Sequence, residues 1–146
     1  MDTIFRLSHN KDLLPFMVRT PSVHASEPRM VWSPALITDK FILLNIVTLD
    51  FNALQQGGVY NTKNGIHEFE RGKTSEIPFF INDDLPSGKW WPDARVATPK
   101  NMSACLLDVT QLKDAYREKK VTGALELLVQ SLDEDDNPIV MIVTFK

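Results

Sequence analysis

The chain has one cysteine, no long apolar run and no excess of positive charge, and each shortage excludes a class of protein. A single cysteine among 146 residues, Cys105, rules out a framework of intramolecular disulfides. It lies in the apolar run from Ala104 to Leu107, where a buried, unreactive thiol is expected. We therefore expect a reducing environment rather than a disulfide-stabilised secreted fold.

Apolar stretches are also short. None reaches the ~18 residues of a membrane-spanning helix, and the first residues lack the basic segment and apolar segment of a secretory signal. We expect a cytoplasmic protein with no membrane partner.

The charge balance argues against nucleic-acid binding. Sixteen basic residues face 19 acidic ones, a formal net charge of −3, whereas a surface that follows phosphates needs clustered positive charge. The nearest basic run, Arg117 to Lys120, is interrupted by Glu118. Hydrophobic residues at 43% and charged residues at 24% are ordinary globular values. Residues 1–146 are expected to form a single globular domain, since no repeat or linker divides them.

Apolar periodicity predicts mostly strands. Alternating or β-branched runs indicate strands at 3–7, 13–18, 41–51, 102–109 and 139–145. The runs 41–51 and 139–145 are apolar on both sides for much of their length, which predicts strands covered on both faces. Two stretches rich in proline and other turn residues, 19–34 and 82–93, are expected to be loops.

Two hairpins are expected. The pair Asn64-Gly65 suits a type I′ turn, which would set Lys63 opposite Ile66 and Tyr60 opposite Phe69. At the C-terminal end, the run 123–132 alternates imperfectly and is joined to 139–145 by an acidic segment ending in Asn137-Pro138. The spacing of Leu125, Leu128 and Leu132 also suits a helix, and this alternative stays open.

One short helix is expected near residues 110–119. Asp108 followed three residues later by Gln111 is a helix-start pattern. Leu112, Ala115 and Tyr116 would share its inner face. The predicted fold is mainly β, a compact antiparallel β-sandwich or barrel of seven to nine strands with this helix. An α+β fold is the alternative, because 111–132 also suits helix.

Motifs that carry known chemistry are missing. His9, His24 and His67 lie in separate segments without metal-ligand spacing. The run Glu70 to Thr74 resembles the end of a phosphate-binding loop, but His67 replaces its first glycine. The acidic run from Asp133 lacks the spacing of a calcium loop. We expect no catalytic residues, no metal and no cofactor, although an enzyme with a dispersed site remains a less favoured reading.

The candidate binding residues surround two adjacent tryptophans. They are Trp90 and Trp91 with Lys89, Asp93 and Arg95, and Trp32 is an outer member. Neighbours in an extended segment face opposite ways, and tryptophan and arginine are enriched at interface hot spots. The alternative is that one tryptophan plugs the end of the sandwich and the other lies flat on the surface.

These observations favour a non-enzymatic protein-binding module, such as a small inhibitor, immunity-type protein, adaptor or assembly protein. Its partner is expected to be a protein, with self-association included. A carbohydrate- or small-molecule-binding protein that stacks its ligand on the tryptophans is the alternative. Changing a tryptophan would weaken sugar binding with little dependence on salt, whereas a protein interface would change its on-rate with salt.

Overall fold

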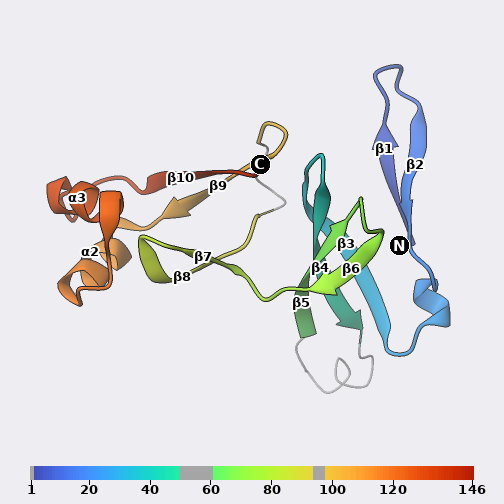
Figure 1. Ribbon diagram of the computed structural model, residues 1–146, viewed down its shortest axis with the longest axis horizontal. Helices are drawn as coiled ribbons and strands as arrows, with labels where there is room; N and C mark the ends of the chain where they lie inside the picture. Colours follow the sequence, from blue (N-terminus) through green and yellow to red (C-terminus); the bar gives the residue numbers. More distant parts are fainter. Residues whose placement is uncertain (1, 50–60, 94–97) are drawn as a thin grey trace. The chain divides into compact units, whose positions relative to one another are not determined.

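The computed structural model describes residues 2–49, 61–93 and 98–146 (Figure 1). Over these residues the chain is mainly β, as predicted. The strands are β1 (Thr3–Leu7), β2 (Leu13–Val18), β3 (Arg29–Ile37), β4 (Phe41–Leu49), β5 (Asn61–Glu68), β6 (Lys73–Glu76), β7 (Phe80–Asn82), β8 (Leu85–Trp90), β9 (Met102–Leu107) and β10 (Ile139–Thr144). The helices are the 3-10 helix η1 (Val23–Ala25) and the α-helices α2 (Val109–Arg117) and α3 (Gly123–Ser131).

The strands form four sheets. Their orders are β1-β2, β3-β4-β5-β6, β7-β8 and β10-β9. Within the described residues they do not close into a barrel. The chain divides into two compact units, residues 1–35 with 41–77 and residues 36–40 with 78–146. The single domain stays a prediction, and each unit has its own core.

Strand β4 is the centre of the first unit. Ile42, Leu43 and Leu44 are each 0% exposed, so side chains on both faces of the strand are buried there, as the sequence predicted. Ile42, Leu44 and Ile46 point to one face, because alternate residues of a strand share a side. The partly buried residues packed against them are Ile4, Met17, Met30 and Trp32.

The predicted turn at Asn64-Gly65 is wrong, because both residues lie inside β5. Gly65 pairs with Leu44 of β4 on one side and with Glu76 of β6 on the other. A Cβ atom at Gly65 would lie 2.8 Å from Cδ1 of Ile46. The glycine therefore makes room for a buried side chain rather than supplying a positive φ. The predicted pair Lys63–Ile66 is absent for the same reason, and Tyr60 lies outside the described residues.

The predicted loop 19–34 is also wrong in its second half, where β3 begins at Arg29. Pro34 lies within β3, and this strand is at the edge of its sheet, where a missing N–H is tolerated. The first half folds around buried Arg19, whose guanidinium donates to Oγ of Ser26 at 3.0 Å. Helix η1 is capped by Ser22, whose hydroxyl accepts from the N–H of Ala25.

In the second unit, α2 and α3 lie between two strands that pair with each other. β9 and β10 are antiparallel, with Leu107 opposite Ile139 and Met102 opposite Thr144. The predicted helix is confirmed as α2, and Oδ1 of its N-cap Asp108 accepts from the N–H of Gln111 at 2.9 Å.

The predicted strand at 123–132 is wrong, and the helical alternative is confirmed as α3. Val129 is 0% exposed and packs with Leu112 and Val121, and Leu125 lies one turn before it against the same cluster. This one-sided contact follows the helical period, which the alternation of apolar residues concealed.

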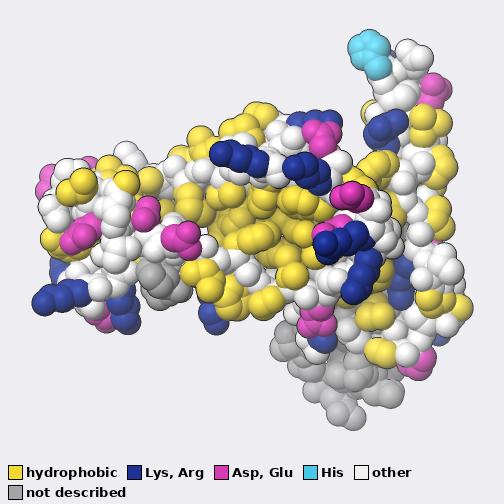
Figure 2. Space-filling model, in the orientation of Figure 1, with side chains coloured by type: hydrophobic (Ala, Val, Ile, Leu, Met, Phe, Trp, Pro, Cys, Tyr) yellow, Lys and Arg dark blue, Asp and Glu magenta, His cyan; other side chains and the backbone are white. Residues whose placement is uncertain are grey.

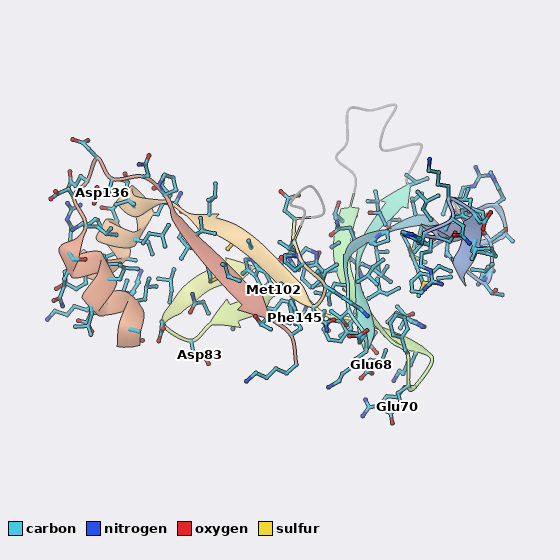
Figure 3. The ribbon with its side chains drawn as sticks, turned by 90° about the horizontal axis from the view of Figure 1, so that it is seen from above. Glu68, Glu70, Asp83, Met102, Asp136 and Phe145 are labelled. Atoms are coloured by element: carbon cyan, nitrogen blue, oxygen red, sulfur yellow. The ribbon has the colours of Figure 1, made fainter. Side chains whose placement is uncertain are left out.

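Two further strand predictions need correction. Strand β10 is not covered on both faces, since Val140 and Ile142 are exposed while their neighbours are half-buried. The predicted loop 82–93 contains β8, which turns back on β7 through Asp83 and Asp84. Figure 3 shows Asp83 at the tip of this hairpin. The turn residues were recognised, but the strand after them was missed because Pro86, Ser87 and Gly88 disfavour strands.

Candidate functional site

The two adjacent tryptophans lie at the end of β8 and just beyond it, in the second unit. Both are half-buried and both contact Phe80 of β7. The Phe80 ring stacks on Trp91 with centroids 5.7 Å apart and an interplanar angle of 11°, and its centroid is 5.3 Å from Trp90. Phe145 completes the group, 5.7 Å from Phe80 and 6.1 Å from Trp90. We call Phe80, Trp90, Trp91 and Phe145 the aromatic cluster.

A cavity of about 500 Å³ lies beside this cluster. We call it the first cavity. Strands β8 and β9 and helix α2 line it, and its apolar lining includes Trp90, Trp91 and Met141. Polar groups are interspersed: Asn82, Lys89, Asp108 and Gln111. Polar groups thus contribute as much of the lining as apolar ones, and the volume falls within the range of about 300 to 1,000 Å³ that is usual for ligand sites.

A second cavity, of about 390 Å³, is lined by β7, β8 and β10. Asn82, Trp90 and Met141 line both cavities. The side-chain amide of Asn82 in β7 donates to the sulfur of Met141 in β10 at 3.3 Å, so this hydrogen bond connects two of the strands that line the cavities. Figure 2 shows hydrophobic side chains gathered where strands β7 to β10 lie.

Lys89 is an exposed, positively charged residue of the site. Its ammonium lies 4.5 Å from the centroid of the Phe79 ring, a cation–π distance. The same side chain belongs to the lining of the first cavity. The positive charge is therefore held over Phe79, which is not among the residues that line either cavity, while Lys89 itself contributes to the lining of the first.

The thiol of Cys105 also lines the first cavity. Burial raises its pKa above the ordinary value, and the nearby indole of Trp90 opposes part of that rise. The indole N–H of Trp90 is itself buried and makes no hydrogen bond of normal geometry. Because the pKa is raised, the thiol stays protonated at neutral pH and is a poor nucleophile.

The other predicted site residues are placed differently. Asp93 is half-buried just after Trp91, and Arg95 lies outside the described residues. Trp32 belongs to the first unit, in β3, where it packs against the core under the guanidinium of Arg19, 5.3 Å from its ring. The structure thus brings Lys89, Trp90 and Trp91 together around one cavity and places Trp32 in a different core.

Sequence reasoning missed Phe80, Phe145 and Asn82. Their roles depend on the pairing of β7 with β8 and on the packing of β7 against β10, which are long-range contacts. The alternation in β10 does supply a local signal, because it sets Met141 on the half-buried face. Gln111 was recognised only as a capping residue, and its side chain lines the first cavity as well.

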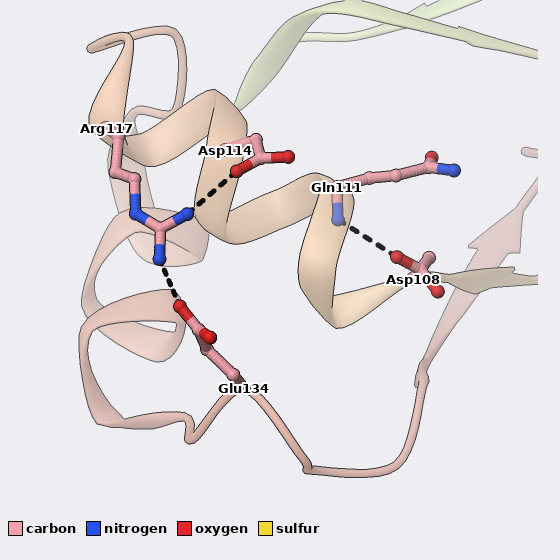
Figure 4. A network of polar contacts seen from close by, with 5 residues as sticks. All are labelled: Asp108, Gln111, Asp114, Arg117 and Glu134. Carbon is pink, nitrogen blue, oxygen red and sulfur yellow. Dashed lines mark hydrogen bonds and ion pairs between the residues drawn. The ribbon is translucent and has the colours of Figure 1, made fainter.

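A polar network lies at the far end of α2 (Figure 4). Arg117 donates to Oδ1 of Asp114 at 2.8 Å and pairs with Glu134 beyond α3. The hydrogen bond and charge of Glu134 raise the pKa of Arg117. All three side chains are exposed, and the network links α2 to the segment after α3.

Among the described residues, no group of three or more His, Cys, Asp and Glu side chains is placed to share a metal ion. The described helices are also too short to cross a membrane. A comparison with family models, curated proteins and solved structures found no match for this chain.

Proposed function

We propose that this chain is a non-enzymatic protein-binding module and that the first cavity, with the aromatic cluster and Lys89, is its binding site. The observation that carries the proposal is an open pocket walled by half-buried tryptophans with a charged side chain at its edge. Trp90 and Trp91 are already held by ring contacts, so binding against them costs little side-chain entropy. This is the arrangement expected of an interface anchor site.

The surroundings of the cavity favour a macromolecular partner. Leu106 lines the first cavity and is 70% exposed, and Ile142 lines the second cavity and is also exposed. Apolar surface therefore continues beyond the pocket. Exposed apolar surface beside a pocket is one of the features that mark protein–protein interaction sites. The partner would place an apolar side chain in the first cavity and an acidic group near Lys89.

The test is an affinity capture from source-cell lysate with the wild type, Lys89→Glu and the control Lys73→Glu. Both lysines are exposed strand residues, so neither change should affect folding, which circular dichroism would verify. We expect a partner that the wild type and Lys73→Glu retain and that Lys89→Glu loses. Trp91→Ala, if folded, should also lose it. Equal capture by Lys89→Glu and folded Trp91→Ala would refute this binding site.

A small-molecule or carbohydrate ligand is the second candidate. The volume of about 500 Å³ and the amides of Asn82 and Gln111 beside the tryptophans support it. Calorimetric titration of a glycan and metabolite panel would test it. Affinity that falls in Trp91→Ala and hardly changes with salt would favour this candidate, whereas an on-rate that depends on salt would favour the protein interface.

A further inference from the structure

The hairpin β1–β2 of the first unit has an apolar face that its own unit does not bury. Antiparallel pairing sets Leu7 opposite Leu13, Phe5 opposite Pro15 and Thr3 opposite Val18. Thr3, Phe5 and Leu7 share a side because they alternate along β1, and their partners in β2 lie on the same face. The register shifts between Ile4 and Phe5, so that Phe16 has no partner in β1 and Val18 stays on this face. We call these six side chains the outer face. Phe5, Leu7, Leu13 and Val18 are 51%, 65%, 64% and 63% exposed.

The opposite face anchors the hairpin at its base, whereas Arg6 and Leu14 farther along that face are exposed, Leu14 at 44%. Ile4 and Met17 are directly paired and pack against the cluster around β4. The backbone N–H of Arg19 donates to the carbonyl of Asp2 at 2.7 Å, and the Phe16 ring contacts Phe69 edge to face, with centroids 6.1 Å apart. Figure 1 shows the hairpin extending beyond the sheet β3–β6 of the same unit. The base is therefore fixed while the outer face is left exposed.

A two-stranded hairpin is at best marginally stable alone, because one of its faces needs an apolar layer to cover it. Among the described strands, β1 and β2 pair only with each other. The turn from Ser8 to Asp12 is ordered by its own hydrogen bonds, including Ser8 N–H to the Asp12 carbonyl at 2.8 Å. The hairpin is therefore held by hydrogen bonds up to its turn, although no layer of its own unit covers its outer face.

Area and charge indicate what would cover it. At roughly 100 Å² of exposed surface for each apolar side chain, the outer face presents on the order of 500 Å². Two such faces against each other would bury about 1,000 Å² in total, which is the lower limit of a specific interface. The outer face contains no charged residue, so two copies can approach without repulsion or unpaired charge. A partner of opposite charge would find nothing to recognise there.

We propose that the outer face is a self-association surface that packs against the same face of a second copy of this chain. A two-fold axis would bring Leu7 and Leu13 of the two copies together in one apolar layer, since a symmetric contact uses the same patch twice. Packing face to face, rather than strand to strand, is favoured because Pro15 has no N–H to offer along β2. The residues of the outer face belong to the first unit and those of the first cavity to the second, and this proposal does not depend on the proposed function.

Sedimentation equilibrium over a range of protein concentrations tests the proposal. The variants are Leu7→Lys and Leu13→Lys, and the matched control is Leu127→Lys on α3, a leucine that is 71% exposed. We expect the wild type and the control to approach the mass of two chains as concentration rises, with a Kd in the micromolar range (~1–100 µM) for so small an interface. Both hairpin variants should remain monomeric while their circular dichroism spectra match the wild type.

Two results would overturn the proposal. One is a wild type that stays monomeric up to about 1 mM. This result would overturn the proposal even if the hairpin bound a different protein. The other is a dimer that persists in folded Leu7→Lys and Leu13→Lys, which would place the contact elsewhere.

Discussion

At several positions in this protein, the neighbouring atoms or the backbone conformation restrict which residue type is tolerated. Gly65 is the clearest case, because the space above it is filled by Ile46, which is only 9% exposed. Gly72 has the opposite requirement. A Cβ atom there would meet nothing within 4 Å, but its φ of +57° favours glycine. The two glycines therefore respond to substitution for different reasons.

We expect Gly65→Ala to destabilise the protein by about 1–3 kcal/mol through overpacking. Adding Ile46→Val, which removes the clashing Cδ1, should recover part of that loss. Gly72→Ala should cost about 1 kcal/mol through backbone strain alone and should not be relieved by Ile46→Val. Each glycine variant is combined with Ile46→Val in a double-mutant cycle, and urea unfolding of the single and double variants measures the coupling free energy in each cycle. Additive effects of Gly65→Ala and Ile46→Val would contradict the steric explanation.

Asp39 illustrates an electrostatic requirement. Lys100 pairs with one carboxylate oxygen, and the side-chain amide of Asn101 donates to the other at 2.9 Å. The hydrogen bond with Lys100, followed by that with Asn101, lowers the pKa of Asp39 below its ordinary value. The stabilisation is therefore present above the ordinary pKa and is lost as pH falls through the lowered folded value.

A carboxyl NMR titration should show Asp39 ionising below its ordinary range. Lys100→Ala should raise the pKa of Asp39, whereas Lys113→Ala, a half-buried lysine on α2, should leave it unchanged. An unaltered Asp39 titration in Lys100→Ala would show that the ion pair is not formed in solution.

At the scale of elements, those with local signals were predicted well. Helix α2 was predicted because Asp108 and Gln111 form its cap within one turn. Strands β1, β2, β4 and β9 followed from apolar runs. Three elements were predicted less well, because each depends on a contact with another element. Strand β8 depends on the pairing of Phe80 with Trp90, and helix α3 on the packing of Leu112 with Val129. The course of β5 depends on the fit of Ile46 over Gly65. The tryptophans could be selected from sequence, but their cavity could not.

The pair α2–α3 has both an apolar contact and an ion network, and their contributions should differ widely. Leu112 is 2% exposed, so Leu112→Ala should cost about 2–5 kcal/mol. Arg117→Ala removes exposed ion pairs with Asp114 and Glu134 and should cost less than about 1 kcal/mol. Urea unfolding monitored by far-UV circular dichroism compares them. Equal losses would mean that the network matters more than its exposure suggests.

At the scale of the whole molecule, each of the two units has a buried hydrophobic cluster among its described residues. One contains Ile42, Leu44 and Ile46, and the other contains Leu112, Val121 and Val129. Each cluster is built from residues of its own unit. The protection of backbone amides should therefore report the two cores separately.

We expect Leu44→Ala to reduce amide protection most in β4 and β5, and Val129→Ala to reduce it most in α2 and α3. Native-state hydrogen exchange measured by mass spectrometry would distinguish these patterns. An equal loss of protection across all elements in both variants would show that the two cores unfold as one cooperative structure.

The insertion of α2 and α3 between β9 and β10 has a consequence for the order of folding. Strand β9 can meet β10 only after residues 108–138 have brought the chain back, and closing so long a loop costs entropy before any strand pair forms. The two helices shorten that search by packing locally. Pairing should then begin at Leu107 and Ile139, beside the helices, and proceed towards Met102 and Thr144. The second cavity, which Ile142, Val143 and Thr144 line, would in that case form after the wall of the first cavity that Leu107, Leu112 and Ala115 provide.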